Sequence, residues 1–136
     1  MMMKYSLDQR KERALALRKQ GYNCSQSVIL VFDDIIGIDK DTIAKLTSGL
    51  GTGVGALREI CGVVNAMAIT QGFLQSPAPE GKAASAKIAG DLGRKFAEGN
   101  KGFLRCCDLK GKDGIRPCND LVLQGVEILH NYFDSL

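Results

Sequence analysis

Five cysteines are the residues of this 136-residue chain that are best suited to chemistry, and they stand at positions 24, 61, 106, 107 and 118. A thiolate is both a nucleophile and a ligand for soft metal ions, so the set suits redox chemistry or metal binding. No pair has the Cys-x-x-Cys spacing of a zinc ribbon or of a thioredoxin-type active site. Ligands this far apart can meet only if several helix ends converge on one side of a bundle.

The odd number of cysteines argues against a permanent disulfide framework. The first residues, MMMKYSLDQRKER, lack the apolar segment of a secretory signal, and no stretch approaches the roughly 18 apolar residues of a membrane span. We therefore expect a cytoplasmic protein with no membrane partner, in which the thiols stay reduced.

Three cysteines stand where helices are expected to begin. Cys24 follows the turn Gly-Tyr-Asn, Cys61 follows a glycine run, and Cys118 follows Pro117. A helix N-terminus presents unpaired N–H groups and the positive end of the helix dipole, which favour a thiolate over a thiol. The alternative is that the cysteines are small apolar residues that pack in a core. Of the adjacent residues at 106 and 107, at most one fits a shared site comfortably.

The glycine run GLGTGVG at residues 49–55 invites comparison with a phosphate-binding loop. It lacks the G-x-x-x-x-G-K-[ST] pattern, and no convincing strand precedes it. Nucleotide binding is therefore the weaker interpretation. We expect these glycines to allow a tight turn that brings backbone N–H groups near Cys61, where they would stabilise charge on the sulfur.

Helix-forming patterns cover most of the chain. The spacing of Ser6 and Gln9 is that of a capping box, which begins a helix that reaches about Gln20. A β-strand through residues 28–32 is the alternative to the second helix. The other expected helices cover residues 24–36, 39–46, 59–74, 82–98 and 117–136, with a short helical piece in 103–109.

The composition predicts an all-α fold, because aromatic residues are few and Ala, Leu, Ile and Gly are common. We expect one domain over residues 1–136, a compact bundle of about five to seven helices around the buried helix at 59–74. Asn65 is the only strongly polar side chain between Ile60 and Ile69, so it would need buried partners. Gly90 and Gly93 would allow close packing within one chain or in a homo-oligomer.

The net charge of +3 is small for this length. The densest group of cations is interrupted by Glu12 and by apolar residues, which indicates the solvated face of a helix rather than a nucleic-acid surface. We therefore expect no nucleic-acid partner. The cations of this group are Arg10, Lys11, Arg13, Arg18 and Lys19.

Polar residues outside the cysteine set give weaker signals. Asp33 and Asp34 lie near a helix end without a recognisable acid–base partner, and we expect both to be solvated. His130 lies on the last helix and is expected to be a packed or surface histidine. Glu59 fits the favourable N-terminal end of its helix, where it could also accept a proton from Cys61.

The cysteines and their neighbours resemble a family of redox-active proteins of about this length, defined by a cysteine, a Cys-Gly-Ala-x-x-Gly motif and two later cysteines. The resemblance runs from about Gly21 to the C-terminal helix. Val63 and Ala66 stand where the motif has Ala and Gly, which would alter a site that needs close backbone approach. The matching blocks are GYNCSQSV at 21–28, GLGTGVGALREICGVVNA at 49–66, CCDLKG at 106–111 and CNDLV at 118–122.

The resemblance implies redox or metal chemistry on four thiols, those of Cys24, Cys61, Cys106 and Cys118. Our first hypothesis is that all four bind an iron–sulfur cluster or a single metal ion such as zinc, and that the protein exchanges electrons with a redox partner protein. The second is a metal-free thiol–disulfide protein with Cys61 and Cys24 as catalytic residues, Cys61 being the attacking thiol. The third is a helical binding module whose cysteines only pack.

Overall fold

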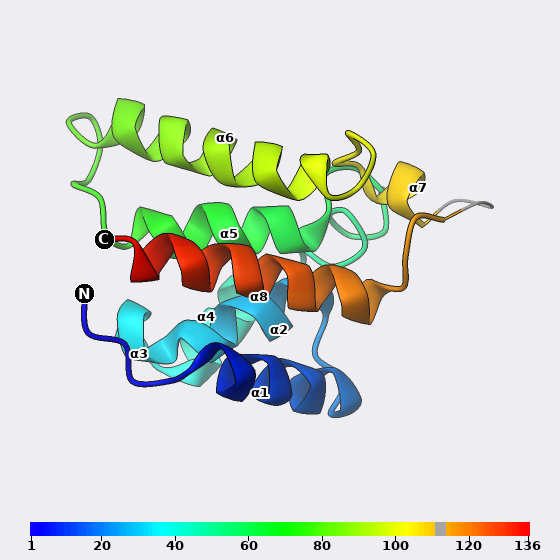
Figure 1. The fold of residues 1–136 in the computed structure, drawn as a ribbon, viewed down its shortest axis with the longest axis horizontal. Helices are drawn as coiled ribbons and strands as arrows, with labels where there is room; N and C mark the ends of the chain where they lie inside the picture. Colours follow the sequence, from blue (N-terminus) through cyan, green and yellow to red (C-terminus); the bar gives the residue numbers. More distant parts are fainter. Residues whose placement is uncertain (111–113) are drawn as a thin grey trace.

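The computed structural model describes residues 1–110 and 114–136, and in these residues the fold is all-α, as predicted (Figure 1). The β-strand alternative for residues 28–32 is wrong, because these residues are helical. The elements are α1 Leu7–Lys19, α2 Cys24–Ile29, the 3-10 helix η1 Leu30–Phe32, α3 Asp33–Ile36, α4 Lys40–Leu46, α5 Gly62–Gly72, α6 Lys82–Glu98, α7 Cys106–Leu109 and α8 Cys118–Asp134.

Helix α5 lies at the centre of the bundle, where it packs against α2, α6 and α8. Figure 1 shows α6, α8 and α1 from top to bottom, with α5 between α6 and α8. Helix α8 comes close to α5 at Gly125, where a Cβ atom would collide with the side chain of Val63. Val63 and Ala66, the two departures from the family motif, are fully buried at this centre.

Local signals set most of the helix ends. The capping box is present, with Gln9 N–H donating to Ser6 Oγ (3.1 Å) and Ser6 N–H donating to Gln9 Oε1 (2.8 Å). The helix expected over residues 24–36 is instead divided into α2, η1 and α3, and it ends at Gly37 in the left-handed region (φ 71°). Helix α6 has the predicted bounds, whereas α5 begins three residues later than predicted.

The expectation that Arg10 and Asp34 are solvated is wrong. Arg10 is fully buried, and its guanidinium donates to both carboxylate oxygens of Asp34 at 2.8 Å. It also donates to the Val31 carbonyl and, through Nε, to His130 Nδ1 (3.1 Å). Burial of the charge is tolerated because each of the three guanidinium nitrogens donates to an acceptor. His130 is therefore a packed histidine, as predicted.

Helix α5 is less completely buried than expected. Asn65 is half-buried, and its amide donates to the carbonyl of Ile60 (3.2 Å), the residue before the helix cap. Ile69 on the same helix is 36% exposed. Asn65 thus needs no partner deep in the core.

The two ends of the bundle differ in content. The chain termini meet at one end, where the N-terminal ammonium donates to the Leu136 carbonyl (3.2 Å), and α7 lies at the other (Figure 1). None of the described helices is both long and apolar enough to cross a membrane.

Candidate functional site

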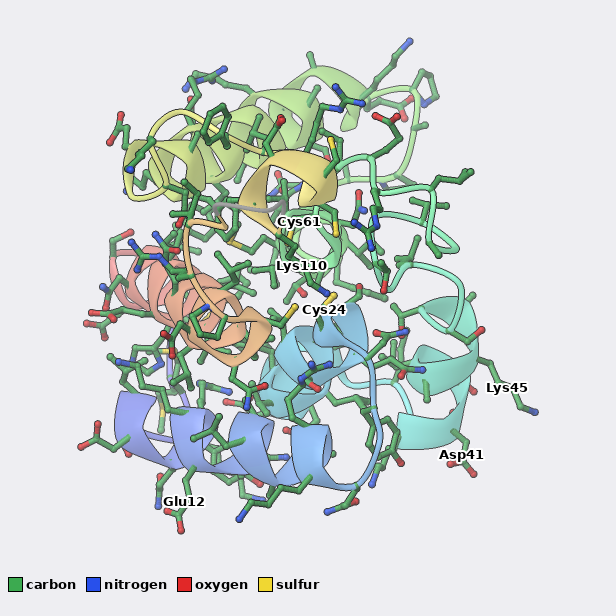
Figure 2. All side chains as sticks on the ribbon, turned by 90° about the vertical axis from the view of Figure 1, so that its right-hand side faces the viewer. Glu12, Cys24, Asp41, Lys45, Cys61 and Lys110 are labelled. Carbon is green, nitrogen blue, oxygen red and sulfur yellow. The ribbon has the colours of Figure 1, made fainter. Side chains whose placement is uncertain are left out.

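Four of the five cysteines line one cavity of about 70 Å³ at the α7 end of the bundle, which lies opposite the chain termini in Figure 1. Figure 2 views this end and labels two of the four, Cys24 and Cys61. Cys107 is not on its wall, although it is adjacent to Cys106. All five cysteines are free thiols, with Cys61 and Cys106 buried and the others half-buried. The wall also includes Arg18, Asn23, Thr52, Gly53, Gly62, Val63, Leu109, Lys110 and Leu121.

Each of the four cavity cysteines stands at the start of a different helix. Cys24, Cys106 and Cys118 are the first residues of α2, α7 and α8, and Cys61 is the N-cap of α5. The prediction for Cys24, Cys61 and Cys118 is thus confirmed, and Cys106 adds a fourth case. The fold therefore brings together four helix starts that are up to 94 positions apart, since 118 − 24 = 94.

Main-chain hydrogen bonds fix Cys61 relative to Cys106. The Cys61 N–H donates to the Leu104 carbonyl (2.9 Å), and the Cys106 N–H donates to the Glu59 carbonyl (2.6 Å). Ile60 and Arg105 form an antiparallel β-bridge between these bonds. No strand pattern predicts this short pairing, which lies in two segments that were expected to be helical.

Glu59 does not lie on helix α5, contrary to the prediction. It precedes the first helical residue by three positions, and its carboxylate accepts two hydrogen bonds from Arg105 (3.0 and 3.1 Å). The ion pair is more than half exposed. Glu59 therefore links the two segments that carry Cys61 and Cys106.

Gly62 makes room for the thiol of Cys24. A Cβ atom at position 62 would lie 2.6 Å from Cys24 Sγ and 2.9 Å from the Leu50 carbonyl oxygen. Any larger residue would displace the sulfur or the loop backbone. The glycine that follows the central cysteine of the motif is thus required by the position of another cysteine.

The glycine loop reaches the cavity through Thr52 and Gly53. Its backbone is left-handed over several successive residues, including the β-branched Val54 (φ 66°), a conformation that costs free energy outside glycine. Hydrogen bonds from Arg58 N–H to Thr52 O and from Glu59 N–H to Gly53 O (both 3.1 Å) close this turn, which lines the same cavity as Cys61. The expected tight turn is confirmed, but the backbone amides that act on the Cys61 sulfur are those of Val63 and Val64 rather than those of the glycine loop.

Burial, rather than the helix start, determines the ionisation of the buried thiols. Desolvation by burial raises the pKa of Cys61 to about 12, outweighing the backbone amides of Val63 and Val64, which lower it; the nearby thiols of Cys24 and Cys106 act in the same direction as burial. Burial also raises the pKa of Cys106. For Cys61, the expectation that the helix start favours a thiolate is therefore wrong in the metal-free protein.

Two cationic residues on the cavity wall were not predicted as site residues. The Cys118 thiol, followed by those of Cys106 and Cys24, raises the pKa of Lys110, so its ammonium lies within electrostatic range of three cavity cysteines. Arg18 is the second cation. Lys110 stands in the CCDLKG block, but only the tertiary fold reveals its proximity to Cys118. Gly111, the last residue of that block, lies outside the described residues.

No group of three or more His, Cys, Asp or Glu side chains among residues 1–110 and 114–136 is arranged so that it could hold one metal ion. The four thiols surround a shared cavity without converging on a single ion-sized point. What they offer is four soft sulfur donors around a space for several atoms.

Comparison with protein families places most of the chain in one family. A model of the family described as "Putative redox-active protein (C_GCAxxG_C_C)" matches residues 22–132, a segment that contains all five cysteines. No curated protein and no solved structure matches the chain.

Proposed function

Since the chain belongs to the C_GCAxxG_C_C family of redox-active proteins, we propose that Cys24, Cys61, Cys106 and Cys118 bind an iron–sulfur cluster and that the protein transfers electrons to or from a partner protein. Such a cluster, when bound, takes up and returns single electrons. The observation that carries this proposal is the meeting of four thiols, from four separate helix starts, around one cavity.

The size of the cavity favours a cluster over a single ion. A water molecule needs roughly 10–15 Å³ of such space, so about 70 Å³ has room for several atoms. In a cluster each thiolate binds one iron and the four thiolates are distributed over several irons, so their sulfur atoms stand farther apart than the four ligands of one zinc ion. The described side chains, which do not converge on one ion, are therefore better suited to a cluster than to zinc.

The ionisation of Cys61 gives less support to the metal-free thiol–disulfide alternative. With a pKa of about 12, this thiol stays protonated near neutral pH, and a protonated thiol is a poor nucleophile towards Cys24 or a substrate disulfide. A bound metal, in contrast, displaces the proton and supplies the positive charge that a buried thiolate lacks. Burial of Cys61 is thus less of an obstacle to a ligand than to an attacking group.

The adjacent residues Cys106 and Cys107 provide a matched test. We expect the wild-type protein and Cys107→Ala, after anaerobic reconstitution with ferrous iron and sulfide, to bind both and to develop charge-transfer absorption in the visible range. Cys106→Ala should lose most of the iron, since it removes a thiol from the cavity wall. Iron and sulfide per chain and the visible spectrum are the measurements.

A wild-type protein that stays colourless after reconstitution would exclude the cluster. Zinc bound in a one-to-one ratio, lost in Cys106→Ala and kept in Cys107→Ala, would instead favour a single-ion site. If the metal-free protein forms a disulfide between two cavity cysteines, and a mild reductant reduces it again, the result favours the thiol–disulfide alternative over the cluster.

A further inference from the structure

The wall of the cysteine cavity is positively charged. Its described residues include two cations, Arg18 and Lys110, and no Asp or Glu. The Arg18 guanidinium donates to Asn119 Oδ1 (3.0 Å) and to the Tyr22 carbonyl (3.2 Å), both of which are neutral acceptors. These bonds orient the cation without cancelling its charge.

Lys110 is held beside the thiols by its backbone. Its N–H donates to the Cys106 carbonyl (2.9 Å) at the end of α7, so its main chain stays about one turn from that cysteine. Figure 2 shows its side chain between those of Cys61 and Cys24. No carboxylate among the described residues lies within salt-bridge distance of its ammonium group.

We propose that the Lys110 ammonium offsets the negative charge of the four thiolates and their cluster. The positive charge would thereby favour the reduced state of the cluster. This inference rests on the proposed function. Four thiolates carry more negative charge than a cluster core carries positive charge, so the assembly is anionic and becomes more so on reduction. A fixed cation nearby then stabilises the reduced form more than the oxidised form, which raises the reduction potential.

The redox step itself is a single-electron transfer. One electron enters from an external one-electron donor, no covalent bond forms or breaks, and the lysine keeps its proton. The only change at Lys110 is a stronger attraction to the site. Its effect is therefore measurable as a shift of the midpoint potential at constant pH.

The test compares four reconstituted proteins: wild type, Lys110→Gln, Lys110→Arg and Lys45→Gln. Lys45 lies on α4 away from the cavity, and Figure 2 shows its side chain pointing into solvent. Midpoint potentials are measured by mediated electrode titration, after the iron and sulfide content has been determined. We expect Lys110→Gln to have a lower potential than wild type, Lys110→Arg to stay near wild type because it keeps the charge, and Lys45→Gln to be unchanged.

The outcomes separate this inference from the proposed function. Failure of the wild type to bind iron and sulfide rejects the function itself. If Lys110→Gln binds the cluster with an unchanged potential, or if Lys110→Arg shifts as far as Lys110→Gln, the role of the charge is rejected while the function stands. If Lys110→Gln fails to bind the cluster and Lys110→Arg binds it, the positive charge is needed at assembly, which supports the inference.

Discussion

The two ends of this helical bundle bury polar groups in opposite ways. At the end near the termini, Arg10 is fully buried and its guanidinium meets Asp34, His130 and the Val31 carbonyl. At the α7 end, the buried thiols of Cys61 and Cys106 share a cavity with two cations and form no disulfide. At the first end, the Arg10 guanidinium finds all of its hydrogen-bond partners within the chain. At the second end, the thiols are possible metal ligands that share no partner within the chain.

This difference separates a structural network from a candidate site. A buried charge with a full set of acceptors stabilises the native arrangement and leaves nothing for a ligand to supply. Buried thiols around a space for several atoms gain most from a ligand that brings positive charge. Changes at the Arg10 end should therefore affect folding, and changes at the cysteine end should affect both folding and what the protein binds.

The largest effect is expected from Asp34→Ala. The substitution leaves the guanidinium of Arg10 buried without its carboxylate, and breaking a buried pair in this way costs about 3–5 kcal/mol of the free energy of unfolding. Urea unfolding followed by circular dichroism measures the loss. Asp33→Ala is the matched control, because the pair of Asp33 with Arg13 is partly exposed and should contribute far less.

Equal losses in Asp34→Ala and Asp33→Ala would contradict this description of the Arg10 end. So would loss of the reconstituted cluster in an Asp34→Ala protein that is still folded, because the network would then reach the cysteine cavity.

The next effect is a loss of stability of the metal-free protein at alkaline pH. The Cys61 thiol has a pKa of about 12 in the folded state against 9.0 for the free group, so the folded state holds the proton more tightly. The resulting stabilisation is complete below pH 9 and is lost as the pH rises towards 12, by an amount on the order of 4 kcal/mol. Unfolding free energies measured from pH 8 to pH 11 test this trend.

Cys61→Ala is the control for the alkaline experiment, since it removes the titrating thiol and should flatten the curve. A wild-type curve that parallels that of Cys61→Ala would show that the thiol ionises without a burial penalty. In that case the thiol–disulfide alternative would regain a competent attacking group.

Gly62→Ala should have an intermediate effect. The added Cβ would lie 2.6 Å from Cys24 Sγ and 2.9 Å from the Leu50 carbonyl oxygen, so either the sulfur or the loop must move. Overpacking of this kind costs about 1–3 kcal/mol. We also expect less iron per chain after reconstitution, because the Cys24 thiol is displaced.

Gly72→Ala, at the end of the same helix, is the matched control. A Cβ there would meet its nearest atom, Ser85 Oγ, at 3.9 Å, so stability should stay the same or rise slightly. If both variants bind iron equally well, Gly62 has no particular role in placing Cys24.

The features predicted correctly from the sequence were those coded by local spacing. The Ser6–Gln9 capping box and the helix expected over residues 82–98 depend on residues a few positions apart, and both appear in the structure. The cysteine set came from the family motifs, and the structure brings its four members to one cavity. The helix starts at the cysteines also follow from nearby turns.

The features that were missed depend on distant residues. Arg10 looked like part of a solvated face because its partner Asp34 lies 24 positions away, and neither residue stands out locally. The bridge between Ile60 and Arg105 has no strand pattern, since it is a single pair between two loops. Lys110 is a site residue only through the tertiary fold, which brings the residue after α7 next to Cys118 at the start of α8.

The smallest effect is expected from Glu59→Gln. Its ion pair with Arg105 joins the segments of Cys61 and Cys106, but both side chains are more than half exposed, where such pairs are screened by water and salt. The main-chain bonds from Cys61 N–H to Leu104 O and from Cys106 N–H to Glu59 O remain after the substitution. We expect no measurable change in unfolding free energy or iron content at either low or high salt. A drop in iron content at high salt in the wild type, and at all salt concentrations in Glu59→Gln, would instead show that this exposed pair holds the two thiols in place.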